Sequence, residues 1–191
     1  METAEILEVL QRTGALLDGH FELRSGLHSD RFFQCANLLR YPRLASDLCV
    51  ALTDKMREAM NSELVVDTVL APALGGIVVG HEVARNLETK SIFAEKQDDK
   101  LVMRRFEIRE GERFVVAEDV VTRGGRVQEC IDIIEARGGI VTAVAVLVNR
   151  SGGKAQFSCP TFSLLEMEPV TFDPESCPLC EKGLPLVHPG S

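Results

Sequence analysis

The sequence has too few basic residues to be typical of a nucleic-acid-binding protein. Lysine and arginine total 21 against 29 aspartate and glutamate residues, which gives the 191-residue chain a net charge of −8. Affinity for DNA or RNA depends on a surplus of Lys and Arg that neutralises phosphates, so no nucleic acid is expected as the main ligand. A local basic pocket for a small anion is compatible with this composition.

Long hydrophobic runs are also missing. The longest, residues 140–148, has the length of a β-strand and contains Thr142, whereas a membrane-spanning helix needs about 20 apolar residues. The first residues, METAEILEVLQRTG, carry acids where a secretory signal peptide carries bases. We therefore expect a cytoplasmic protein that does not bind membranes. Its 45% hydrophobic and 26% charged residues are ordinary for one globular domain spanning residues 1–191.

The six cysteines do not follow the pattern of a disulfide framework. Cys177 and Cys180 are the only close pair, and their spacing is that of half a zinc site. His188 and Cys159, or the same pair in a second subunit, could supply the missing ligands. A thioredoxin-like role is not expected, because the pair lies in a proline-rich tail and not at a strand-to-helix turn. Two reduced structural thiols are favoured over a metal site or a disulfide.

The histidines have no partner that the sequence identifies. His20, His28 and His81 match no metal-ligand pattern and have no evident carboxylate neighbour. His28 belongs to the segment FELRSGLHSDRFFQ, where it could contact a bound ligand. A position in a surface turn is the plainer expectation for this residue.

Apolar periodicity predicts an alternation of helices and strands. Helices are expected over residues 3–13, 42–61, 76–87 and 127–134, and strands over 65–70, 91–95, 114–118, 140–148 and 163–167. Residues 97–113 are rich in charge and are interpreted as a mobile loop or a hairpin. The alternation is typical of an α/β domain with a central parallel sheet flanked by helices.

Three segments should meet at one edge of that sheet. They are APALGG (71–76), EDVVTRGG (118–125) and NRSGG (149–153). Each follows an expected strand, and ligands of parallel sheets bind beyond the carboxyl ends of the strands. The glycine spacing fits neither GxxxxGK[ST] nor GxGxxG, so a nucleotide-binding loop of those types is not expected.

The segment EDVVTRGG combines two features that usually repel each other. Its glycines and the following helix form an anion cradle, in which backbone N–H groups and the positive helix end face a phosphate. Two acids, Glu118 and Asp119, stand only a few residues away. The acids make sense if the ligand also offers hydroxyl groups, or a magnesium ion reached through water. A ribose with a 5-phosphate would satisfy both halves.

This segment resembles the phosphoribosyl pyrophosphate motif of the type I phosphoribosyltransferases. In that family the acids hold the ribose hydroxyls and the loop holds the 5-phosphate. Small residues are usual where this chain has Arg123 and Arg126. The resemblance implies that phosphoribosyl pyrophosphate is bound by Glu118, Asp119, Val120, Val121, Thr122, Arg123, Gly124, Gly125 and Arg126.

Further segments resemble the orotate phosphoribosyltransferases of that family. FELRSGLHSDRFFQ is similar to a hood whose charged residue and Phe pair lie over the pyrimidine, and NRSGG is similar to a strand end whose Arg contacts orotate. APALGG is similar to the pyrophosphate loop, here Ala73, Leu74, Gly75 and Gly76. The resemblance implies orotate contacts from Arg24, Phe32, Phe33, Thr122 and Arg150.

The segment EKQDDKLVMRRFEI corresponds to the catalytic loop of the family, which brings cations over the pyrophosphate, often from the partner subunit. Lys96 matches one such lysine best, and Lys100, Arg104 and Arg105 are candidate replacements for the others. The resemblance therefore implies catalytic roles for Lys96, Lys100, Glu118 and Asp119. A solvated, charged hairpin is the alternative for the cations.

The implied activity is magnesium-dependent transfer of phosphoribosyl to orotate, giving orotidine 5′-monophosphate for pyrimidine biosynthesis. The implied fold is one phosphoribosyltransferase domain with a hood formed by residues 1–40 and part of 151–191. A homodimer with shared sites is also implied, with Mg²⁺ held through the substrate near Glu118 and Asp119. The alternatives are a purine phosphoribosyltransferase and a non-catalytic regulator that binds phosphoribosyl pyrophosphate.

Overall fold

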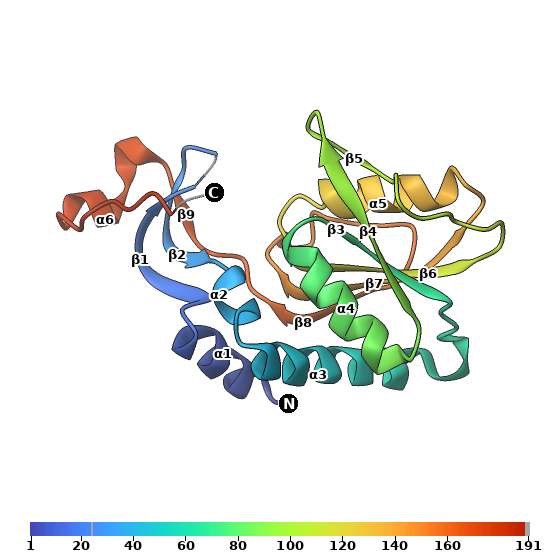
Figure 1. Ribbon diagram of the computed structural model, residues 1–191. Coiled ribbons are helices and arrows are strands. Elements are labelled where there is room, and N and C mark those ends of the chain that lie inside the picture. Colours follow the sequence, from blue (N-terminus) through green and yellow to red (C-terminus); the bar gives the residue numbers. More distant parts are fainter. Residues whose placement is uncertain (24, 190–191) are drawn as a thin grey trace. The chain divides into compact units, whose positions relative to one another are not determined.

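The computed structural model describes residues 1–23 and 25–189 of the chain. Two compact units are present (Figure 1). The larger one spans Leu39–Met167, and the smaller one combines Met1–Leu38 with Glu168–Ser191. The assignment of the whole chain to a single domain with a hood stays a prediction.

The larger unit is built on a six-stranded sheet, in the order β5-β4-β3-β6-β7-β8. Its strands are β3 Thr68–Pro72, β4 Lys90–Gln97, β5 Lys100–Val102, β6 Arg113–Val121, β7 Ile140–Asn149 and β8 Thr161–Glu166. All neighbours are parallel except β5, which pairs antiparallel with β4. The expected α/β class with a central, mostly parallel sheet is confirmed.

Helices cover both faces of this sheet (Figure 1). They are α3 Pro42–Met60, α4 Gly75–Leu87 and α5 Gly125–Glu135, with a 3₁₀ turn, η1, at Asn61–Glu63. The apolar side of α5 packs on one face, where Ile131 and Ile134 meet Val116 and Val144 in a buried cluster. Helix α4 lies on the other face so closely that a Cβ on Gly80 would stand 2.7 Å from the Ala71 Cβ. The central strands are thus covered on both sides, which explains their continuous apolar runs.

Element boundaries follow local chemistry. Helix α3 begins at Pro42, whose fixed φ suits the first helical position, as predicted. The strand expected at 65–70 instead begins at Thr68, after the bidentate ion pair that Arg113 makes with Asp67 at 3.0 and 3.1 Å. The charged stretch 97–113 opens with β5, so it forms a hairpin with β4 before an irregular segment.

Strand β6 continues beyond the expected end at Glu118. Its last residues pair with β7, where Val120 faces Val148 and Val121 faces Asn149. Strand β3 ends its pairing with β6 at Val116. Glu118 and Asp119 therefore lie within the strand, on a stretch that only β7 still borders.

The smaller unit is a three-stranded antiparallel sheet with short helices. It contains α1 Thr3–Arg12, β1 Leu16–Glu22, β2 His28–Phe33, β9 Thr171–Phe172, the 3₁₀ turn η2 Pro174–Ser176 and α6 Pro178–Glu181, and α2 Ala36–Leu39 ends at its boundary. The strand order is β1-β2-β9. Phe33 is buried and Phe32 is half-buried, as the alternation of side chains along a strand requires.

Within residues 1–23 and 25–189, no helix has both the length and the apolar character needed to cross a membrane.

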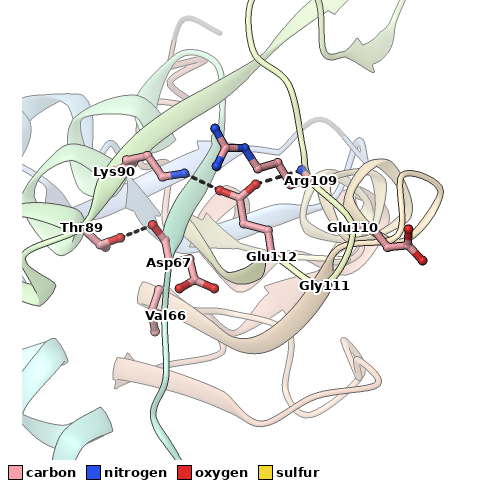
Figure 2. Close-up of a pocket in the computed structure, with 8 residues that line it drawn as sticks. All are labelled: Val66, Asp67, Thr89, Lys90, Arg109, Glu110, Gly111 and Glu112. Carbon is pink, nitrogen blue, oxygen red and sulfur yellow. Dashed lines mark hydrogen bonds and ion pairs between the residues drawn. The ribbon is translucent and has the colours of Figure 1, made fainter.

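A pocket of 510 Å³ opens at the amino-terminal edge of the parallel strands, opposite the edge where ligands of such sheets bind (Figure 2). Its central group is the buried carboxylate of Glu112, which accepts hydrogen bonds from Thr68 Oγ1 at 2.6 Å and the Arg109 amide at 3.0 Å, and an ion pair from Lys90. Burial alone would raise the pKa of Glu112. The Arg109 amide, Lys90 and Thr68 outweigh burial and hold this pKa below its usual value. These contacts of Glu112 link the first residues of β3 and β4 to the segment that precedes β6.

We expect Glu112→Gln to lower the free energy of unfolding at pH 7 by about 2 kcal/mol, since a charged acceptor is lost from a buried network. A depressed folded-state pKa stabilises the fold above the unfolded value of about 4.3, and that stability is lost as pH falls through the folded pKa. Urea unfolding from pH 7 to pH 3 should therefore show the two proteins converging at acid pH. Glu110→Gln, at an exposed position of the same pocket, is the control; a difference between wild type and Glu112→Gln that persists unchanged at pH 3 would contradict the assignment.

Candidate functional site

The ends of β6 and β7 lie side by side at the carboxyl edge of the sheet. The Arg150 amide donates to the Val121 carbonyl at 2.8 Å. Thr122, the next residue after β6, therefore begins its loop beside Arg150 at the end of β7. Thr122 and Arg150 belong to two different sequence motifs, and the parallel pairing of β6 with β7 brings their backbones together.

The loop from β6 to α5 forms one wall of a pocket of 320 Å³. Its lining residues are Glu118, Val120, Val121, Thr122, Arg123, Gly124, Gly125, Arg126, Val127 and Glu129. Gly124 caps α5 in the left-handed conformation with φ of 80°, and a Cβ there would lie 2.9 Å from Phe157 Cζ. The first helical hydrogen bond runs from the Gln128 amide to the Gly124 carbonyl, so the preceding amides of α5 are oriented to bind an anion.

Of the two acids of β6, Glu118 lines this pocket, and Asp119 follows it directly in the strand. Glu118 is 7% exposed; its Oε1 accepts the Asp119 amide at 3.0 Å, and Asp119 Oδ1 accepts the Val120 amide at 2.9 Å. Burial is the main cause that raises the pKa of Glu118, and the Asp119 carboxylate adds to it. The pair can hold a proton, accept hydroxyl donors or face a cation.

The loop from β3 to α4 packs directly onto these acids. A Cβ on Gly75 would stand 2.5 Å from Asp119 Oδ2, and a Cβ on Gly76 would stand 2.9 Å from Glu118 Oε1. Any side chain at either position would therefore displace a carboxylate. Leu74, just before them, is 83% exposed. The backbone of residues 73–76 thus reaches the acids, as expected for a loop that offers its amides to a phosphate.

Hard oxygen donors dominate the floor of the site, and these are the ligands that Mg²⁺ prefers. The chain contributes the carboxylates of Glu118 and Asp119, with the glycine backbone of residues 75–76 against them. Magnesium usually keeps several waters and reaches the protein through few carboxylates and substrate phosphates. The residues present fit that mode of binding.

The predicted catalytic cations lie on and after the β4–β5 hairpin. Lys96 Nζ pairs with Asp99 at 2.7 Å, and Arg104 Nε pairs with Glu95 at 3.3 Å. Arg105 pairs with the same glutamate, while Lys100 is exposed at the start of β5. Lys96, Arg104 and Arg105 are therefore accessible but engaged with neighbouring carboxylates.

Arg126 lines the pocket, and its implied contact with phosphoribosyl pyrophosphate stays a prediction. Its guanidinium donates to Glu129 at 3.2 Å and to the Asp99 carbonyl at 3.0 Å. Glu129 in turn accepts the Leu101 amide at 2.7 Å. Arg126 and Glu129 thus join the start of α5 to the tip of the β4–β5 hairpin.

The expected orotate contacts fall in both units. Arg150 and Thr122 belong to the larger unit, and Phe32 and Phe33 to the smaller one. Arg24 lies outside the described residues. Phe32 is the more accessible ring of its pair, and its centroid is 5.8 Å from that of Phe21.

Sequence reasoning did not single out Ser151. Its side chain is 3% exposed, and its Oγ has no hydrogen-bond partner among the described residues. The Ser151 amide donates to Asn149 Oδ1 at 3.0 Å, which shapes the turn after β7. The only signal in the sequence was its place in NRSGG, directly after the arginine.

Comparison with known proteins identifies relatives over nearly the whole chain. A phosphoribosyl transferase domain model matches residues 42–174. The orotate phosphoribosyltransferase of Desulforamulus reducens is 45% identical over 192 residues, covering 100% of this chain and 98% of the relative. That of Caldicellulosiruptor bescii is 46% identical over 186 residues, covering 97% and 95%.

The fold is also shared with solved structures. The crystal structure of orotate phosphoribosyltransferase from Aeropyrum pernix superposes with a TM-score of 0.68 at 24% identity, over 85% of this chain and 93% of that one. At this level of identity the likeness concerns the fold alone.

Gly75→Ala is expected to weaken pyrophosphate binding by at least about fivefold, since overpacking against Asp119 costs about 1–3 kcal/mol and displaces the backbone there. Titration calorimetry with magnesium pyrophosphate measures the effect. Gly80→Ala is the matched control, because it adds the same methyl group to α4 against apolar Ala71. The control should lower the melting temperature and leave the affinity of the folded protein unchanged; equal affinities for Gly75→Ala and wild type would refute the close approach.

Proposed function

The chain belongs to the orotate phosphoribosyltransferases of the phosphoribosyl transferase domain family, and we propose that it transfers the 5-phosphoribosyl group of phosphoribosyl pyrophosphate to orotate. An orotate ring nitrogen forms a bond to the anomeric carbon while the bond from that carbon to pyrophosphate breaks. The products are orotidine 5′-monophosphate and pyrophosphate. The observation that carries this proposal is the acid pair of β6 lying between two glycine-containing loops.

Each of the two glycine-containing segments suits a different phosphate group of the substrate. The amides at the start of α5, with Thr122, suit the 5-phosphate, because they present N–H donors at the positive end of a helix. The backbone of residues 73–76 suits the pyrophosphate. Backbone donors contact the 5-phosphate whatever the side chain at position 123, so the loop can carry the exposed Arg123.

Glu118 and Asp119 suit the ribose between those phosphates. Glycosyl transfer passes through a state with positive charge on the ribose ring, and carboxylates near the ring stabilise that charge. Burial and the Asp119 carboxylate raise the pKa of Glu118, and a nearby positive charge would act in the opposite direction and favour its carboxylate form. When bound, Mg²⁺ would neutralise charge on the departing pyrophosphate, held through the substrate near these two acids.

Arg150 suits the orotate carboxylate. It follows β7 at the carboxyl edge of the sheet, beside Thr122, and a guanidinium fork pairs with a planar carboxylate through two hydrogen bonds. The resemblance assigns further contacts with the base to Arg24, Phe32 and Phe33. A base without a carboxylate would leave Arg150 without this partner.

The cations Lys96, Lys100 and Arg104 would act on the leaving pyrophosphate. Two of them must first leave Asp99 and Glu95, and exposed ion pairs of this kind are worth only about 0.2–1 kcal/mol. Exchange of a carboxylate for a pyrophosphate oxygen is therefore inexpensive. Closure of this hairpin over the ribose would also exclude water, which otherwise hydrolyses the substrate.

The decisive experiment follows the loss of orotate absorbance with phosphoribosyl pyrophosphate and Mg²⁺, beside parallel assays with adenine, hypoxanthine and uracil. We expect turnover of orotate alone. Turnover of a purine instead would identify a purine phosphoribosyltransferase. Binding of phosphoribosyl pyrophosphate without turnover of any base would identify a regulator.

Arg150→Ala tests the base assignment within the same assay. It should raise the KM for orotate by at least about tenfold, because about 1.5–3 kcal/mol is typical of a hydrogen bond to a charged group, and leave the KM for phosphoribosyl pyrophosphate nearly unchanged. Arg137→Ala, on an exposed arginine just after α5, is the control. Equal effects on both substrates would assign Arg150 to the phosphates.

A homodimer with shared sites is the proposed assembly, with the β4–β5 hairpin of one subunit serving the other. Lys96→Ala and Asp119→Asn should each abolish most turnover alone. Mixing the two purified variants and allowing subunits to exchange should restore activity, because one hybrid site then contains both wild-type residues. A mixture no more active than the sum of its parts would place both residues in the same subunit's site.

A further inference from the structure

Four potential metal ligands converge inside the smaller unit. Among the described residues, His20, His28, Cys177 and Cys180 have ligand atoms that all lie within 4.8 Å of one another. The first three side chains are buried, at 3%, 5% and 1% exposure, and Cys180 lies at the surface. The phosphoribosyl transfer described above uses none of them.

Four of the six distances between these atoms are close to those of a tetrahedral site. His20 Nε2 lies 3.6 Å from Cys177 Sγ and 3.7 Å from Cys180 Sγ, and His28 Nδ1 lies 3.3 Å from Cys180 Sγ. Zinc bonds of about 2.3 Å to sulfur and about 2.0 Å to nitrogen place S···N neighbours about 3.6 Å apart at tetrahedral angles. The two ring nitrogens are 2.9 Å apart, against about 3.3 Å in the same geometry. The remaining pairs lie within 4.8 Å.

The second ring nitrogen of His20 is already fixed. His20 Nδ1 lies 2.9 Å from the Leu184 carbonyl, and a carbonyl can only accept, so Nδ1 carries the proton. Neutral His20 then has a lone pair on Nε2, the atom that faces both thiols. Metal-binding histidines typically donate their other N–H to a carbonyl or carboxylate in this way.

The backbone presents the two cysteines together. Cys177 caps the short helix α6, Pro178 occupies its first turn, and the Glu181 amide donates to the Cys177 carbonyl at 3.2 Å. The chain then turns at Gly183, with φ of 66°, and leads to Leu184. From there residue 187 pairs with β1, where the Val187 amide donates to the His20 carbonyl at 2.8 Å. The tail is thus led back to the strand that carries His20.

These contacts correct the ligands considered from the sequence. His188 pairs with Glu22 at 3.3 Å and is largely exposed. Cys159 packs against the buried cluster beneath α5 in the larger unit. Neither belongs to the group around Cys177, and His28 is a buried residue of β2, not part of a surface turn.

We propose that His20, His28, Cys177 and Cys180 bind one structural zinc ion, which joins the C-terminal tail to the β1–β2 hairpin. Two cysteines and two histidines, the only members of this group among the described residues, form a closed set typical of structural zinc. A unit of this size buries only a small core, so a metal link would add stability. None of the four residues belongs to the phosphate loops or the acid pair.

A metal-free alternative exists for the histidines. His28 Nδ1 could donate a proton to His20 Nε2 across their 2.9 Å separation. That hydrogen bond explains why the two rings lie close together. It does not explain why two thiols also lie within 3.7 Å of the same ring nitrogens. The experiment must therefore distinguish a bound ion from a neutral hydrogen-bonded cluster.

The first measurement is the zinc content of the full chain, purified without a histidine tag or chelator, by mass spectrometry of the elements. About one zinc per chain is expected for a closed four-ligand site. Replacement by Co²⁺ should give the intense visible absorption of a tetrahedral thiolate complex. Either of two results would overturn the proposal. One is reduced protein that neither contains zinc nor binds added Zn²⁺ or Co²⁺. The other is a Cys177–Cys180 disulfide, found by peptide mass, in the protein as purified.

Variants then assign the ligands. Cys177→Ser and His28→Gln should lower the zinc content at least about tenfold, since each removes one of four ligands. Cys159→Ser and His188→Gln are the matched controls and should retain full zinc. Zinc retained by Cys177→Ser would overturn the assignment.

Wild-type protein supplies a test that does not depend on a variant folding. A mercurial reagent that blocks thiols should release the zinc to a colour-forming chelator. Bound zinc should also protect Cys177 and Cys180 from alkylation, while removal of the metal lowers the melting temperature and Zn²⁺, but not Mg²⁺, restores it. Alkylation of these two cysteines at the same rate with and without zinc would refute the site.

Discussion

Two carboxyl groups on adjacent residues of one strand impose the main constraint on the larger unit. Glu118 is buried and Asp119 follows it directly, and like charges so close together resist ionisation. The fold supplies two amide donors to them and leaves the strand open beyond Val116, where β3 no longer pairs. It also brings the first turn of α4 against them at Gly75 and Gly76, which have no side chains. Strand length, glycine positions and helix placement all follow from accommodating that pair.

The cations around the acid pair are themselves paired with other acids. Lys96 and Arg104 are held by acids of the β4–β5 hairpin, and Arg126, which lines the same pocket as Glu118, is held by Glu129. Arg126 lowers the pKa of Glu118, but burial and Asp119 outweigh it, so this pKa stays above its usual value. The chain stores its cations in weak, exposed pairs that a more highly charged anion can replace.

Much of the larger unit could be predicted from sequence because its signals are local. Nearby residues alone indicated the start of α3 at Pro42, the apolar strands β6 and β7, and the start of α5 after its glycines. Each of these elements is present in the structure. The start of β3 was wrong by a few residues, because the Asp67–Arg113 pair that precedes it joins residues 46 positions apart. The roles of the site residues themselves stay predictions, since no local pattern fixes what a side chain binds.

The smaller unit shows where such reading fails. CPLC was visible as half a site, but its partners on β1 and β2 lie 157 and 152 positions away, and no periodicity links them. Nearby His188 looked the better candidate only because sequence distance was the sole guide. His20 and His28 stand near the cysteines because the pairing of β1 with β2 buries both rings. The sequence around Gly26 predicted turns and did not indicate this pairing.

The smaller unit is built from the two ends of the chain, and this determines when it can form during synthesis. All strands and helices of residues 39–167 have been synthesised before Cys177 is added to the chain, and domains tend to fold as units during synthesis. The β1–β2 hairpin must therefore wait, with two histidines unpaired with the cysteines, until the segment that carries Cys177 and Cys180 has been made. The smaller unit, which is the first to begin, is thus the last to be completed.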